Sequence, residues 1–101
     1  MKTSVVHCMR HSYDVYIGRG KDPITGELSI WGNPFSHIES RIPGVIRVAT
    51  RHDAIECYRD WLEFQPELLA QLSSLKGKVL GCWCKPADCH GDVLAELAEK
   101  C

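Results

Sequence analysis

The chain has 101 residues, of which 45% are hydrophobic and 25% are charged, and its formal net charge at pH 7 is -1. This length suits a single domain over residues 1–101, and the composition excludes a disordered or fibrous chain. Because the charge is close to neutral, nucleic acid as a partner has no support from net charge. We also expect no membrane partner and a cytoplasmic location, since there is no continuous signal-peptide core and no apolar stretch of spanning length.

Two short strands are predicted near the amino end, over residues 4–9 and 15–18, and the polar break HSYD between them suggests a hairpin. Glycine and proline then punctuate residues 18–44, which predicts a long ordered loop region. Loops of this length usually carry function or contain short strands. We expect Trp31 and Phe35 to anchor this loop against the core.

The middle of the chain predicts helices. Residues 45–49, VIRVA, suit another short strand, and Thr50 then provides a helix cap. Apolar residues at helical spacing predict a helix over 51–64. A proline suited to a first helical turn opens a second predicted helix over 66–75.

The carboxyl-terminal third combines one strand with one helix. Residues 78–83 have the pattern of a buried strand, and residues 92–100 form an amphipathic helix. Mixing of strands and helices favours an α/β fold, a small single-domain sheet, mixed or mainly parallel, with helices packed on it. The segment that joins the last strand to the last helix, GCWCKPADCHGD over residues 81–92, contains three of the six cysteines.

This segment is predicted to bring four reactive side chains together. Side chains alternate along a strand, so Cys82 and Cys84 share one face, and Trp83 points to the other face into apolar packing. A proline-containing turn leads to Cys89 and His90 at the start of the last helix. Two thiols at a strand end therefore meet a thiol and an imidazole at a helix start.

One interpretation is a metal site. Cys82, Cys84, Cys89 and His90 form one of the known tetrahedral zinc ligand sets, and clustered cysteines in a cytoplasmic protein often bind metals. Adjacent Cys89 and His90 would lie about 100° apart on a helix, so all four reach one ion only if the helix begins later. In this interpretation the chain is a zinc-stabilised module that binds protein or nucleic acid.

A second interpretation is a ligand pocket at the turn 84–92. A helix start attracts anions and lowers the pKa of a cysteine placed there, here Cys89. His90 as acid or base and Asp92 as a carboxylate complete a candidate catalytic set for hydrolysis or group transfer. A purely structural interpretation stands beside it, in which the thiols pack, Asp92 complements the helix dipole and Gly91 permits close packing.

Ligand-binding candidates outside this turn follow from sheet geometry. Arg19 lies between two glycines at the end of the strand over 15–18, and Asn33 precedes a proline, which leaves its amide to cap a turn or contact a ligand. If that strand runs parallel to 78–83, Arg19 and Cys84 lie at the same sheet edge, where α/β proteins bind ligands. We expect Arg19, Asn33 and Cys84 to bind a small anionic ligand such as a nucleotide or nucleoside derivative.

Three segments resemble a known family. GCWCKPADCHGDVLAEL, YIGR at residues 16–19 and GNPF at residues 32–35 are similar to the signatures of a domain family of unknown function found in phages and bacteria. The ending is more weakly similar to a second uncharacterised family with a Cys-His-Arg motif, whose arginine is replaced here by Gly91. The first resemblance implies one fold and one shared site for the three segments, in the host cytoplasm for a phage-encoded chain, and it implies no particular reaction.

Overall fold

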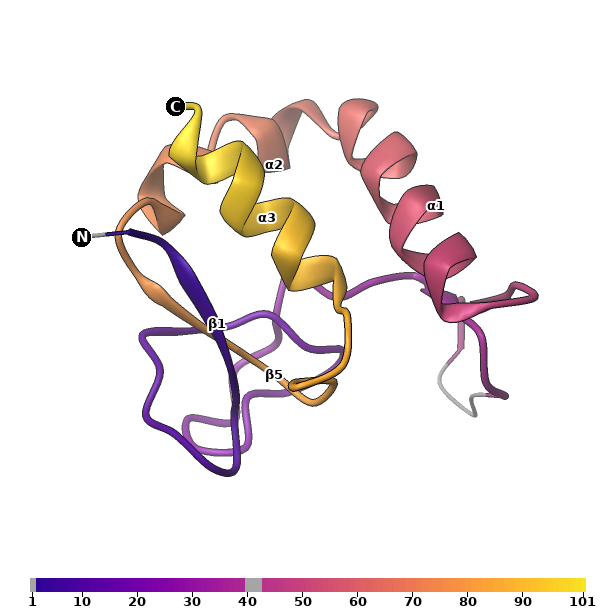
Figure 1. The fold of residues 1–101 in the computed structure, drawn as a ribbon, viewed down its shortest axis with the longest axis horizontal. Coiled ribbons are helices and arrows are strands. Elements are labelled where there is room, and N and C mark those ends of the chain that lie inside the picture. The colour runs from indigo at the N-terminus through magenta and orange to yellow at the C-terminus, as the bar shows by residue number, and fades with distance from the viewer. Residues whose placement is uncertain (1, 40–42) are drawn as a thin grey trace.

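The computed structural model describes residues 2–39 and 43–101. Its centre is a three-stranded sheet in which β5 (Val79–Cys82) lies between β1 (Ser4–His7) and β2 (Val15–Tyr16). β5 runs parallel to both neighbours (Figure 1). The chain is therefore a small α/β domain with a parallel sheet, as predicted.

The predicted hairpin is wrong, because β1 and β2 do not pair with each other. Each pairs with β5 instead, with His7 opposite Cys82 on one side and Tyr16 opposite Gly81 on the other. The most apolar strand thus takes the central position, where hydrogen bonds on both edges satisfy its buried backbone. The parallel direction assumed for the strands containing residues 15–18 and 78–83 is confirmed, so their carboxyl ends lie at one edge.

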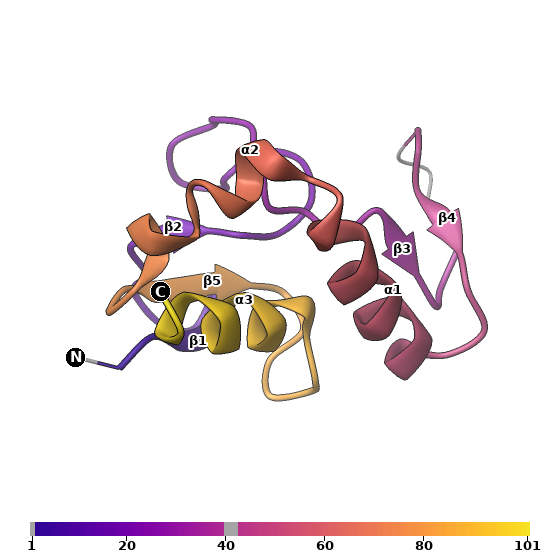
Figure 2. The ribbon, with the colours of Figure 1, turned by 90° about the horizontal axis from the view of Figure 1, so that it is seen from above.

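The predicted loop over residues 18–44 contains a short strand, and residues 40–42 within it lie outside the described residues. This strand, β3 (Phe35–Ser36), pairs in parallel with β4 (Ile46–Arg47), which is the predicted strand over 45–49 in shorter form. The pair stands beside the first long helix, away from the main sheet (Figure 2).

Helix α1 (Arg51–Glu63) confirms the predicted helix and its cap, because the Thr50 side chain accepts a hydrogen bond from the Asp53 backbone. The predicted continuous helix over 66–75 is wrong in extent. It consists of α2 (Pro66–Leu69) followed by a separate 3₁₀ turn, Leu72–Leu75. Residues three apart eclipse in a 3₁₀ turn, and this geometry buries both of its leucines at once.

The last helix, α3 (His90–Glu99), lies across β1 and β5 and packs against α1 (Figures 1 and 2). Gly91 permits this approach, since a Cβ atom there would lie 2.5 Å from Cδ1 of Ile17 and 2.9 Å from Cγ1 of Val5. The close packing predicted for Gly91 is confirmed. No helix within the described residues combines the length and apolar character needed to cross a bilayer.

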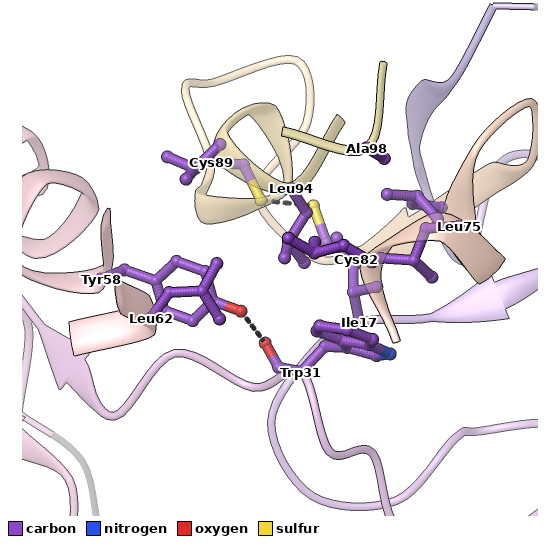
Figure 3. Close-up of a cluster of buried hydrophobic side chains, with 12 residues drawn as sticks. Ile17, Trp31, Tyr58, Leu62, Leu75, Cys82, Cys89, Leu94 and Ala98 are labelled. Atoms are coloured by element: carbon purple, nitrogen blue, oxygen red, sulfur yellow. Dashed lines mark hydrogen bonds between the residues drawn. The ribbon is translucent and has the colours of Figure 1, made fainter. Parts of the chain in front are cut away.

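The core lies between the sheet and the helices. The Tyr58 hydroxyl of α1 donates a hydrogen bond of 2.9 Å to the carbonyl of Trp31, which closes the core from the loop side as predicted (Figure 3). The buried cluster consists of Ile17, Trp31, Tyr58, Leu62, Leu72, Leu75, Leu80, Cys82, Cys89, Val93, Leu94 and Ala98. Two of the thiols in the cysteine-rich segment are therefore part of the core wall.

Candidate functional site

A cavity of about 490 Å³ opens where β5 ends and where α1 and α3 begin. Its walls are formed by Gly18, Arg19, Asn33, Phe35, Ser36, His37, Ile38, Arg51, Ala54, Ile55, Cys82, Trp83, Cys84, Asp88, Cys89 and His90. The cavity thus brings together the three segments singled out in the sequence. Of the predicted site residues only Asp92 is outside its lining.

Three thiols form a cluster in this wall. The Sγ atoms of Cys82, Cys84 and Cys89 all lie within 4.8 Å of one another, and those of Cys82 and Cys89 are 2.8 Å apart (Figure 3). Cys82 and Cys89 are buried, whereas Cys84 is exposed. The prediction that Cys82 and Cys84 lie together is confirmed, although β5 ends at Cys82 and Cys84 lies in the turn after it. The three sulfur atoms are placed to hold a metal ion.

Cys89 is the N-cap of α3 rather than its first helical residue. Its backbone is extended, with φ -146° and ψ 152°, and its Sγ accepts a hydrogen bond of 3.3 Å from the Gly91 N–H. Asp92 completes a capping box by accepting 3.1 Å from the Cys89 N–H, and it pairs with Lys85 at 2.6 Å. The helix therefore begins late enough for Cys89 to reach the other thiols, and Asp92 serves the helix start.

His90 lies beside the thiol cluster but outside its 4.8 Å set. Its Nε2 is 2.7 Å from the Ile17 carbonyl, which can only accept, so Nε2 carries the proton. Nδ1 lies 3.6 Å from Sγ of Cys89, and the ring packs edge-on against Tyr58 at 4.8 Å. Burial lowers the pKa of His90, and the imidazole is neutral with Nδ1 directed toward a thiol.

Within the cluster, the pKa of Cys84 is lowered from the ordinary value of a thiol. Hydrogen bonding with Cys82 and then with Cys89 is the main cause, and the positive charge of the nearby Arg51 acts in the same direction. Hydrogen bonding within the cluster raises the pKa of Cys82 and that of Cys89. The lowered pKa predicted for Cys89 is therefore wrong and belongs to Cys84. The reason is tertiary: Cys84 is the exposed member of the cluster, whereas Cys89 is buried beside the other two thiols.

Arg19 and Asn33 build the opposite wall. Arg19 donates from Nε to the Asn33 carbonyl at 2.6 Å and from Nη2 to the Phe35 carbonyl at 2.9 Å. The buried Asn33 side chain accepts 2.9 Å from the Phe35 N–H and donates 3.1 Å to the Ala54 carbonyl. Asn33 therefore caps a turn, one of its two predicted roles, and ties the GNPF segment to α1. Nη1 of Arg19 makes no hydrogen bond within residues 2–39 and 43–101.

Several lining residues were missed by sequence reasoning, and Arg51 and Trp83 are the most informative of them. Arg51, the first residue of α1, donates from Nη1 to the Asp88 carbonyl at 3.3 Å, and no local pattern relates this helix start to the turn after β5. Trp83 is 50% exposed, so its predicted apolar packing is wrong. β5 ends at Cys82, and the Trp83 indole N–H instead donates a hydrogen bond of 2.7 Å to the Tyr16 hydroxyl.

The comparisons with known proteins identify a family for the chain. The chain is 31% identical over 100 residues to the "Uncharacterized 12.4 kDa protein in nrdA-td intergenic region" of Enterobacteria phage T4, covering 95% of this chain and 77% of that protein. No solved structure matches. A family model described as "Domain of unknown function (DUF4326)" matches residues 3–100, which include all three signature segments. The chain therefore belongs to this family of unknown function, and the predicted family resemblance is confirmed.

Proposed function

We propose that the cavity binds a small anionic ligand of the nucleotide or nucleoside type. The observation that carries the proposal is the presence of two arginines, Arg19 and Arg51, in one cavity at the carboxyl ends of parallel strands. Guanidinium groups bind phosphate and carboxylate through directed, charge-assisted hydrogen bonds. The starts of α1 and α3 add positive dipole ends beside them.

The apolar part of the cavity suits a nucleobase. Its volume of about 490 Å³ lies in the range of small-molecule sites. Phe35, Ile55 and the half-exposed ring of Trp83 supply flat or apolar walls, and bases stack on such rings. Asp88 also lines the cavity, and its carboxylate would suit a ligand that carries donor groups as well as anionic ones.

The chemistry predicted for Cys89, His90 and Asp92, hydrolysis or group transfer, stays a prediction. The geometry favours the thiols and His90 over Asp92, because Asp92 already caps α3 and pairs with Lys85. A thiolate at Cys84 with the neutral imidazole of His90 nearby would supply a nucleophile and a base. Six free cysteines keep their thiols in a reducing compartment, so the proposed location is the cytoplasm.

Binding is tested by thermal unfolding of metal-free protein with nucleoside triphosphates, monophosphates, nucleosides and inorganic phosphate. A ligand present at 100 times its Kd stabilises the protein by about 2.7 kcal/mol, which raises the melting temperature of a domain of this size by roughly 10 to 20 °C. Arg51→Gln should weaken binding by about tenfold or more, because it removes a charge-assisted donor. The matched control is Arg10→Gln, since Arg10 is exposed and lies outside the cavity.

A stabilisation that is identical in Arg51→Gln and wild type would contradict the cavity as the binding site. The absence of any shift with the whole ligand panel would contradict the proposal itself.

A second function is favoured by the thiol cluster. In this alternative, zinc held by Cys82, Cys84 and Cys89 joins the end of β5 to the start of α3 and stabilises a module that binds protein or nucleic acid. About one zinc per chain after purification without chelator is expected. Chelation should then lower the melting temperature sharply, whereas a folded chain with an unchanged melting temperature after chelation would contradict a stabilising role.

A further inference from the structure

We infer that Cys82, Cys84 and Cys89 form a three-sulfur site for a thiophilic divalent ion such as zinc, whose fourth coordination position opens into the cavity. This differs from the four-ligand set predicted from the sequence, because His90 is removed from it. The inference of a bound ion with an open position depends only on the geometry of the three thiols. Only the identity of the fourth donor, an oxygen or nitrogen atom of the bound ligand, rests on the proposed cavity function.

The sulfur positions suit one ion. A tetrahedral zinc with bonds of about 2.3 Å places its sulfur ligands about 3.8 Å apart. The three Sγ atoms already lie within 4.8 Å of one another. Cys82 and Cys89 are closer than the ideal, at 2.8 Å, so this pair separates slightly on metal binding and the three thiol protons are released to solvent.

The backbone holds the three sulfurs from two sides. Cys82 is the last residue of β5, a strand paired on both edges, and Cys89 is the extended N-cap of α3. Cys84 is in the turn between them and is the exposed member. Two ligands are therefore fixed by the core, and the third is free to adjust when an ion binds.

His90 is poorly placed to complete a closed site. Its Nε2 donates to the Ile17 carbonyl and its ring packs against Tyr58, so the ring is held away from the centre of the cluster. Nδ1 approaches only Cys89, at 3.6 Å, and is outside the set of mutually close ligand atoms. Three protein ligands and one open position are typical of zinc sites that bind a substrate or water.

The surrounding charges favour such a centre. Three thiolates and a divalent ion carry one net negative charge, which the guanidinium groups of Arg19 and Arg51 and the positive end of α3 offset. All three cysteines line the cavity, so the open position faces the space in which these groups would hold an anion. A ligand bound by the arginines would present a donor atom to the ion.

Cobalt substitution tests the inference on the full chain. Co²⁺ added to metal-free protein should bind at one ion per chain and give sulfur-to-cobalt charge-transfer absorption together with the visible bands of a four-coordinate site. Addition of imidazole, and separately of inorganic phosphate, should shift those visible bands, because each replaces the solvent molecule at the open position.

Variants assign the ligands. Cys84→Ser should weaken Co²⁺ binding by more than about tenfold, since loss of even an outer-shell partner costs about 10- to 100-fold. Cys101→Ser is the matched control, because Cys101 is exposed and outside the cluster, and it should bind Co²⁺ like wild type. His90→Gln should leave the charge-transfer bands in place.

Absence of stoichiometric Co²⁺ binding by folded protein would overturn the inference. The inference would also be overturned if Co²⁺ binds but its visible bands do not shift with imidazole or phosphate and do change in His90→Gln. In that case His90 would occupy the fourth coordination position. Neither result bears on nucleotide binding by metal-free protein, so failure of the metal site is distinguishable from failure of the cavity function.

Discussion

The two long helices begin beside the same cavity with different chemistry. α1 begins after Thr50 with the sequence Thr-Arg-His-Asp, and α3 begins after Cys89 with Cys-His-Gly-Asp. Both N-cap side chains accept a backbone N–H, but hydroxyls and carboxylates are the preferred caps, and a thiol is only a weak acceptor. A cysteine at the second start is therefore a poor choice for capping alone, which argues that the sulfur serves the cluster.

The largest expected difference in stability between the two helix starts is at the second helical residue. Gly91 in α3 abuts Ile17 and Val5, whereas the corresponding His52 in α1 is exposed. Gly91→Val should lower the free energy of unfolding by about 2 to 3 kcal/mol through overpacking, and His52→Val should change it by less than about 0.5 kcal/mol. Urea unfolding measures both, and equal effects would contradict the close approach of α3 to the sheet.

The two aspartates at the third helical position come next. Asp92→Ala removes the acceptor of the Cys89 N–H and the ion pair with Lys85, so a loss of about 1 to 2 kcal/mol is expected. Asp53→Ala removes mainly the interaction with the dipole of α1, for which about 0.5 kcal/mol is expected. If chemical unfolding gives the same loss for both variants, the capping box of α3 adds nothing to stability.

Substitutions at the two N-cap residues distinguish a role in helix capping from a role in the thiol cluster. Thr50→Ala should cost about 1 kcal/mol, and Thr50→Ser should restore most of it. Cys89→Ser should cost metal-free protein less than about 1 kcal/mol, because the hydroxyl still accepts the Gly91 N–H. The same variant should lose Co²⁺ binding. A Cys89→Ser protein that retains full Co²⁺ affinity would remove Cys89 from the ligand set.

The smallest expected effect is a change in the pH dependence of stability, caused by a glutamate near the carboxyl end of α3. Thr3 donates from Oγ1 at 2.7 Å and from its backbone N–H to Glu99 in α3, which lowers the pKa of Glu99. A lowered native pKa contributes stability that is fully present above the ordinary pKa of a glutamate and is lost as the pH falls through the lowered value. Glu99→Gln should flatten the decline in stability between about pH 5 and pH 3 relative to wild type. The exposed Glu63→Gln at the end of α1 should decline like wild type.

Local patterns were sufficient for much of the molecule. Helical spacing and the Thr50 cap predicted α1, and the apolar run predicted β5, because these signals depend on residues only a few positions apart. The meeting of Cys82, Cys84 and Cys89 was also predictable, since only a short turn separates the end of the strand from the start of the helix.

Long-range packing decided the rest. β1 and β2 lie on either side of β5 rather than against each other, because the central position satisfies the backbone of the most buried strand, and no local pattern encodes that order. Arg51 reaches the cavity only because α1 packs beside α3, and the pKa of Cys84 is lowered while that of Cys89 is raised only because the fold gathers thiols of unequal burial. Distances between segments far apart in the chain set these properties, whereas the residue types alone set which chemistry the cavity can support.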